Sequence, residues 1–103
     1  MFTVQDRGDY TLVSFDIGGV ITPDALATLT PPAVDARKGV VLSGRGPVWF
    51  YAFLVHHYHP TAWVATYDPR LGGAVVVQSH STSATIGSVV PLAEGGTSSP
   101  GKC

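Results

Sequence analysis

Four histidines are the side chains of this sequence best suited to acid–base or metal chemistry: His56, His57, His59 and His80. Neutral imidazole is the commonest metal ligand, and it titrates close to physiological pH. Three of the four lie at or just after the end of an apolar segment, 48–57, and the last follows a second apolar segment, 74–79. His56 and His59 are three residues apart, as on one helix face. We expect His57 to be structural, because a cation is favoured at a helix C-terminus.

A glycine-rich stretch, Ser43-Gly44-Arg45-Gly46-Pro47, directly precedes the apolar segment 48–57. A strand, a turn and a helix in that order would aim free backbone N–H groups and an arginine at an anion near the helix start. We therefore predict that Ser43, Gly44, Arg45 and Gly46 bind phosphate. An ordinary strand-to-helix turn is the alternative for a bare Gly-x-Gly, and the interposed Arg45 favours binding.

The triplet Asp68-Pro69-Arg70 places a carboxylate beside a guanidinium at the end of an expected strand, 62–67. The two glycines that follow, Gly72 and Gly73, keep the connection to the next strand compact. Asp68 and Arg70 are therefore candidates for metal and phosphate contacts. A surface salt bridge is the alternative for this pair.

The elements that must position these residues follow from hydrophobic periodicity and turn residues. The triplet Arg7-Gly8-Asp9 predicts a hairpin turn, and Thr22 with Pro23 predicts the start of a short helix. A brief apolar run, 39–42, predicts a central strand covered on both faces. Strands are expected at 2–4, 10–17, 39–42, 62–67, 74–79 and 86–92, and helices at 25–29 and 48–57. The fold class is α/β, with one mixed sheet.

Topology then divides the candidate residues between two edges of the sheet. A right-handed crossover through the helix 48–57 makes the strand 62–67 parallel to the strand 39–42. Ser43 and Arg45 should therefore share an edge with Asp68 and Arg70. The hairpin that follows returns the chain to the other edge, so His80 should lie near His59, about 20 Å from Asp68 at ~3.3 Å per residue. A site that uses both edges needs two protein molecules.

From length and composition we expect one small cytosolic domain. Hydrophobic residues make up 45% of its 103 residues and charged residues 13%, so the chain should fold. A net charge of −1 argues against coating long DNA, and no apolar stretch is long enough to cross a bilayer. The single cysteine, Cys103, fits a reducing cytoplasm. We expect the domain at 1–93 and a disordered tail at 94–103.

Two blocks of sequence, Val34 to Trp49 and Val64 to His80, closely resemble segments of the type III CRISPR-associated Csx-type ring nucleases. The resemblance runs from about Met1 to His80. It implies a small α/β protein distantly similar to the Rossmann-like ligand-binding domains of CRISPR effectors. The double glycine after the Asp-Pro-Arg triplet departs from the family pattern, and similarity is lost after Ser81.

The resemblance also implies an activity. The family forms homodimers that bind cyclic tetra-adenylate, stack into a tetramer or higher assembly around it, and cut it with manganese support. By position, the catalytic residues fall on His59, Asp68 and Arg70, and His80 matches a histidine linked to metal dependence. Asp68, His80 and His59 are then the expected Mn²⁺ ligands.

The chemistry expected is attack of a ribose 2′-hydroxyl on the adjacent phosphodiester, with His59 as base or acid and with Arg45 and Arg70 binding phosphate. Three other functions remain open. The chain could be a metal-dependent 3′-exoribonuclease on short or adenylate-tailed RNA, or a non-catalytic receptor of cyclic oligoadenylate. It could also be an α/β dimer with incidental histidines.

Overall fold

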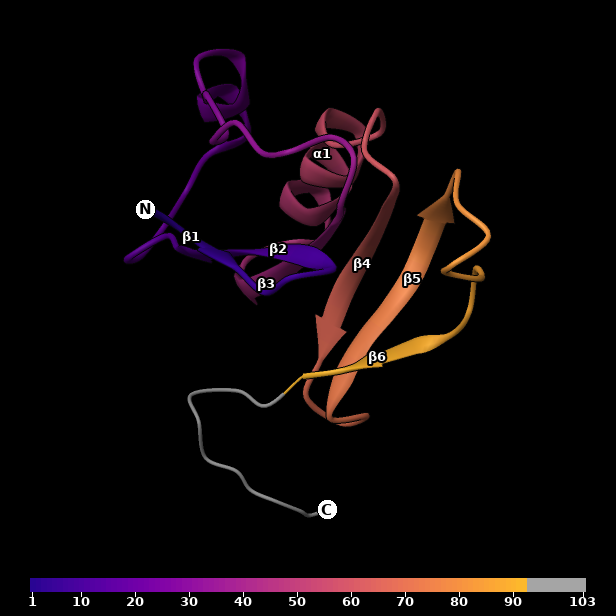
Figure 1. Cartoon of the computed structure of the whole chain (residues 1–103). Helices are drawn as coiled ribbons and strands as arrows, with labels where there is room; N and C mark the ends of the chain where they lie inside the picture. Colours follow the sequence, from indigo (N-terminus) through magenta and orange to yellow (C-terminus); the bar gives the residue numbers. More distant parts are fainter. Residues whose placement is uncertain (93–103) are drawn as a thin grey trace.

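A six-stranded mixed sheet forms the body of the protein, and its strands lie side by side in chain order (Figure 1). The computed structural model describes residues 1–92. One α-helix, α1, and one 3₁₀ helix, η1, accompany the strands. The elements are β1 (Phe2–Asp6), β2 (Tyr10–Asp16), η1 (Pro23–Ala27), β3 (Gly39–Arg45), α1 (Val48–His57), β4 (Trp63–Asp68), β5 (Gly73–Ser79) and β6 (Val89–Pro91).

The three strands β2, β3 and β4 run parallel, and antiparallel strands flank them on both sides. The hairpin β1–β2 turns at Gly8, whose φ of 84° suits glycine. The chain then passes through η1 to β3, and through α1 to β4. The expected α/β class with a mixed sheet is confirmed.

Helix α1 covers one face of the sheet, and it begins and ends where the sequence predicts. Phe50 and Leu54 are fully buried against a layer of strand residues that includes Val13, Leu42 and Val64. Partly buried side chains from 17–34 pack against the same layer. The helix is therefore enclosed on more than one side, which explains why its sequence is apolar almost throughout.

The opposite face of the sheet is covered by the chain that follows β5. Ala84, in the connection between β5 and β6, and Leu92, just after β6, pack with Val41, Trp63 and Val76. The Trp63 ring lies against Gly39 at the start of β3. A Cβ at Gly39 would come within 2.0 Å of this ring, so only glycine leaves room for it. A second apolar core thus forms without a second α-helix among residues 1–92.

A β-bulge interrupts the pairing of β4 with β5. Val64 pairs with Gln78 whereas Ala65 pairs with Val76, so Val77 is the extra residue. The alternation of side chains along β5 shifts by one at this point. Ala74 and Val76 face the core around Trp63 before the bulge, and Ser79 pairs with Trp63 after it.

Four expected elements differ in their bounds. Strand β1 continues to Asp6 instead of ending at residue 4. Strand β3 continues through Arg45 instead of ending at Leu42. The short helix is a 3₁₀ turn at Pro23–Ala27 in place of 25–29, because the Thr22 hydroxyl pairs with the Asp24 carboxylate and caps no backbone N–H. The last strand is shortened to Val89–Pro91, since 85–88 forms a turn. The expected tail, 94–103, lies outside the described residues.

Replacing Gly39 by alanine should lower the free energy of unfolding by about 1–3 kcal/mol, because the added methyl overlaps the Trp63 ring. Urea unfolding followed by circular dichroism measures the change. The matched control is Val48→Ala, since Val48 is 85% exposed and its loss should change stability by less than about 0.5 kcal/mol. Equal stabilities of the two variants would contradict this packing.

Candidate functional site

The carboxyl ends of β2, β3 and β4 meet at one edge of the sheet, here called the carboxyl edge: Asp16, Arg45 and Asp68 end these strands. Asp68 accepts hydrogen bonds from the Arg70 backbone N–H at 2.9 Å and from the Arg70 guanidinium at 3.1 and 3.3 Å. These bonds hold the pKa of the Asp68 carboxyl below its usual 3.8. Asp68 is therefore an anion at neutral pH.

The Asp68–Arg70 pair leaves its guanidinium accessible. The Arg70 side chain is 88% exposed and the Asp68 side chain 25%. A guanidinium has five N–H donors, and Asp68 accepts from only two of the nitrogens. Arg45 is also exposed at this edge. The prediction that Arg45 shares an edge with Asp68 and Arg70 is confirmed, because β3 and β4 are parallel neighbours that end there. Guanidinium groups are suited to phosphate oxygens.

The expected backbone cradle at Ser43–Gly46 is wrong in its geometry. Ser43, Gly44 and Arg45 are strand residues that pair with β2, and they form no turn. The Gly44 N–H donates to the Tyr51 hydroxyl at 3.0 Å, and that hydroxyl donates to the Gly44 carbonyl. Ser43 is only 8% exposed. Anion binding at this edge therefore depends on the Arg45 side chain, and the roles predicted for Ser43, Gly44 and Gly46 stay predictions.

Removing the Tyr51 hydroxyl, in Tyr51→Phe, should destabilise the protein by about 1–3 kcal/mol, because both polar groups of Gly44 lose their partner. Chemical denaturation measures the loss, and hydrogen exchange at Gly44 should become faster. The matched control is Tyr10→Phe, which keeps the ring that packs on Trp63. A Tyr51→Phe protein as stable as this control would contradict the role given to the hydroxyl.

His59 and His80 come together at the opposite edge, here called the histidine edge. Their ring centroids are 5.0 Å apart and the rings are nearly perpendicular, at 77°. The backbone N–H of His80 donates to the Ala62 carbonyl at 2.9 Å, and the backbone carbonyl of His59 accepts from the Gln78 side chain at 2.9 Å. The predicted proximity of the two histidines is confirmed. Both side chains are exposed, so either imidazole can meet a ligand.

The other two histidines lie at the end of α1. His56 and His57 are exposed, and the His57 ring packs edge-on against Tyr58 with centroids 4.8 Å apart. Tyr58 is buried, and its hydroxyl donates to the Pro32 carbonyl. His57 thus helps to cover a core residue, in keeping with the structural role expected for it.

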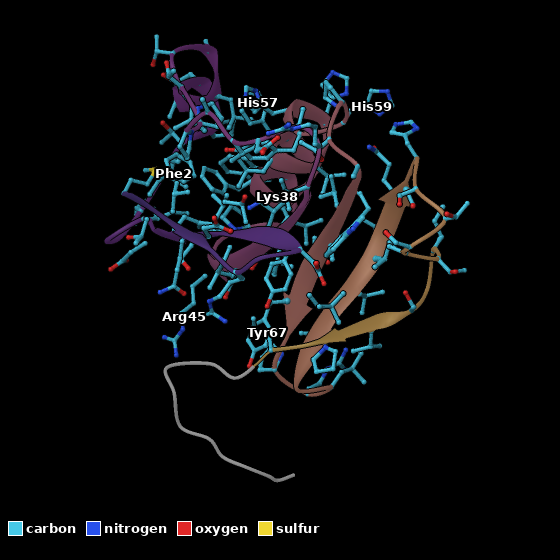
Figure 2. The ribbon with its side chains drawn as sticks, viewed as in Figure 1. Phe2, Lys38, Arg45, His57, His59 and Tyr67 are labelled. Carbon is cyan, nitrogen blue, oxygen red and sulfur yellow. The ribbon has the colours of Figure 1, made fainter. Side chains whose placement is uncertain are left out.

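The histidine edge and the carboxyl edge lie at opposite ends of β4 (Figure 2). The six residues of β4 alone span about 17 Å at ~3.3 Å per residue. Among residues 1–92, no three His, Cys, Asp or Glu side chains come close enough to hold one metal ion. One chain therefore does not assemble the expected Mn²⁺ ligands His59, His80 and Asp68. Two imidazoles offer a partial ligand set that a carboxylate from elsewhere would complete.

Tyr67 is a member of the carboxyl edge that sequence reasoning missed. It precedes Asp68 on β4, and Figure 2 shows it at the same end of the sheet as Arg45. Its half-buried ring packs beside the core around Trp63. The alternation of β4 could have revealed it, because Trp63, Ala65 and Tyr67 must share a face.

Residues 14–91 match the family model described as CRISPR-associated protein (Cas_csx3). The chain belongs to this family. The matched region begins within β2 and ends at the last residue of β6, so it contains both edges of the sheet. The family assignment agrees with the resemblance seen in the sequence at the level of CRISPR association.

A protein of Aquifex aeolicus (strain VF5), described as uncharacterized, is 48% identical to this chain over 88 residues. The alignment covers 80% of this chain and 78% of that protein. Within residues 1–92, no helix combines the length and the apolar character needed to cross a membrane. The family match and the alignment with this relative each cover most of the chain.

Proposed function

We propose that this protein is a manganese-dependent ring nuclease that cleaves cyclic tetra-adenylate, the second messenger of type III CRISPR defence. The observation that supports the proposal best is the pairing of His59 with His80 at one edge while Asp68 and Arg70 occupy the other. Membership of a CRISPR-associated family supports the same biological setting.

The active site proposed is composite. A base at the histidine edge and a phosphate-binding guanidinium at the carboxyl edge are too far apart to act on one phosphodiester within one chain. Two homodimers stacked with the histidine edge of one against the carboxyl edge of the other would enclose a ligand between them. Such a contact joins two different surfaces and is heterologous.

Cleavage is proposed to proceed by transesterification within the ligand. The ribose 2′-oxygen attacks the adjacent phosphorus, the bond from phosphorus to the 5′-oxygen breaks, and a 2′,3′-cyclic phosphate forms. His59 removes the 2′-proton or supplies the proton that the departing 5′-oxygen takes up. Arg45 and Arg70 donate to the phosphate oxygens, where negative charge increases in the transition state.

The residues that would hold Mn²⁺ are Asp68 of one molecule with His80 and His59 of another. The pKa of Asp68 is lowered by its bonds to Arg70, so at neutral pH the carboxylate is ready to act as a ligand. Carboxylate and imidazole together suit this borderline ion. When bound, the metal would polarise a phosphate oxygen and join the two edges.

The composite site predicts that two inactive variants restore each other. His59→Ala and Asp68→Ala should each slow cleavage of labelled cyclic tetra-adenylate by about 10²- to 10⁴-fold, as expected for loss of a general acid–base group or a metal ligand. In an equal mixture, half of the histidine edges and half of the carboxyl edges are intact. About one quarter of the contacts, and of the activity, should then return.

The matched control for this experiment is His57→Ala, which removes an exposed imidazole of the same helix end and should keep full activity. Chromatography of the products gives the rates and shows whether a 2′,3′-cyclic phosphate forms. Folded variants that stay inactive when mixed would contradict a shared site. Tight binding of the intact ring without cleavage would make the protein a receptor, and cleavage of linear RNA alone would make it an exoribonuclease.

Removing divalent metal with EDTA should abolish cleavage, and added Mn²⁺ should restore it. His80→Ala should raise the Mn²⁺ concentration required for half-maximal rate by about tenfold or more, because one ligand is lost. The rate is measured across a Mn²⁺ titration, with His56→Ala as the control for an exposed imidazole. An unchanged Mn²⁺ requirement in His80→Ala would exclude His80 as a ligand.

A further inference from the structure

A cavity of about 580 Å³ lies at the amino ends of β2, β3 and β4, on the sheet face opposite α1. Its volume falls within the range of small-molecule sites, about 300–1,000 Å³. None of the residues placed in the composite site lines it. The side chains that line it and carry the argument are Asp9, Tyr10, Arg37, Lys38, Trp63 and Ser81.

Two aromatic rings form the apolar part of the lining. The Tyr10 and Trp63 centroids are 5.9 Å apart, and their planes are tilted by 53°. Trp63 is only 6% exposed and is fixed across Gly39, so it cannot move aside. Tyr10 is half-buried. Tyr10 lines the cavity beside the fixed Trp63 ring, and an aromatic ring in a cavity lining can stack with a nucleobase.

Two cations, Arg37 and Lys38, line the same cavity. The Arg37 guanidinium is 90% exposed, and Asp35 accepts from it at 3.0 and 3.1 Å. Lys38 donates to Asp6 at 2.9 Å. Arginine has five N–H donors and lysine three, so both retain donors after these pairs form. The acidic partners orient the cations without using all their hydrogen-bonding capacity, which suits phosphate recognition.

The remaining polar groups suit a sugar. The Asp9 carboxylate would repel a phosphate, but it can accept hydrogen bonds from vicinal ribose hydroxyls, as acidic residues do in dinucleotide-binding proteins. Across the cavity, the hydroxyls of Ser81 and Ser83 lie 2.7 Å apart and hydrogen bond to each other. The Ser83 backbone N–H also donates to the Ser81 hydroxyl at 3.0 Å, so it is the Ser83 hydroxyl that keeps a free lone pair for the polar edge of a base.

We propose that this cavity binds a purine nucleoside monophosphate, with the base on Tyr10 and the phosphate at Arg37 and Lys38. A purine offers more stacking surface to one ring than a pyrimidine does. The site adjoins the histidine edge, because Ser81, which lines the cavity, directly follows His80. The backbone N–H of His80 also donates to the carbonyl of Ala62, another lining residue. The proposal stands apart from the nuclease function, since it requires binding and no cleavage.

Isothermal titration of the full chain with AMP, GMP, UMP and adenosine tests the proposal. AMP and GMP should bind. UMP should bind about tenfold more weakly because its base offers less stacking area, and adenosine should bind about tenfold more weakly because it has no phosphate. Tyr10→Leu and Arg37→Gln should each raise the Kd for AMP about tenfold. Arg7→Gln is the matched control, because it removes the same charge from a residue outside the lining.

Thermal melts confirm that each variant is folded, and Arg37→Gln, at an exposed position, provides the test if Tyr10→Leu fails to fold. His59→Ala should bind AMP within about twofold of the parent protein while it loses cleavage, so the two proposals can fail separately. No AMP binding by the parent protein would overturn the nucleotide site. Equal affinities of Arg37→Gln and Arg7→Gln would also overturn it.

Discussion

The parallel pairing of β3 and β4 is the constraint on which the rest of the structure depends. Parallel neighbours cannot be joined by a tight turn, so the chain must return through α1 to the amino end of the sheet. This return places the histidines that follow α1 at one end of β4 and Asp68 at the other. The separation of the two reactive edges is thus a property of the topology, and changes of individual side chains would not remove it.

The two edges differ in how their polar groups are held. At the carboxyl edge, Asp68 and Arg70 are bound to each other within one turn, so their arrangement depends on local chain geometry. At the histidine edge, His59 and His80 come from distant parts of the chain, and two hydrogen bonds fix their backbones. The His80 backbone N–H donates to the Ala62 carbonyl, and the Gln78 side chain donates to the His59 carbonyl. The distance between the His59 and His80 rings therefore depends on the pairing of β4 with β5. The Asp68–Arg70 pair does not depend on that pairing, because both residues belong to one turn.

Much of the fold could be predicted from sequence because its signals are local. Pro47 and the apolar run after it defined α1 to the residue, and the predicted hairpin after the strand 62–67 placed His80 near His59. The cradle at Ser43–Gly46 failed because pairing of Ser43, Gly44 and Arg45 with β2 keeps the chain extended there. The cavity beside Trp63 was equally invisible, since it depends on a contact between strands. The chemical roles of His59 and Asp68 remain predictions.

The bulge at Val77 has a consequence for how the sequence can vary. Val77 is one residue more than the ladder with β4 needs, so its removal would close the bulge and leave Ser79 opposite Trp63. A one-residue insertion has no such outlet, because it would turn the residues that follow it to the other face and move His80 out of register with His59. We therefore expect homologues to lose a residue from this strand more readily than they gain one.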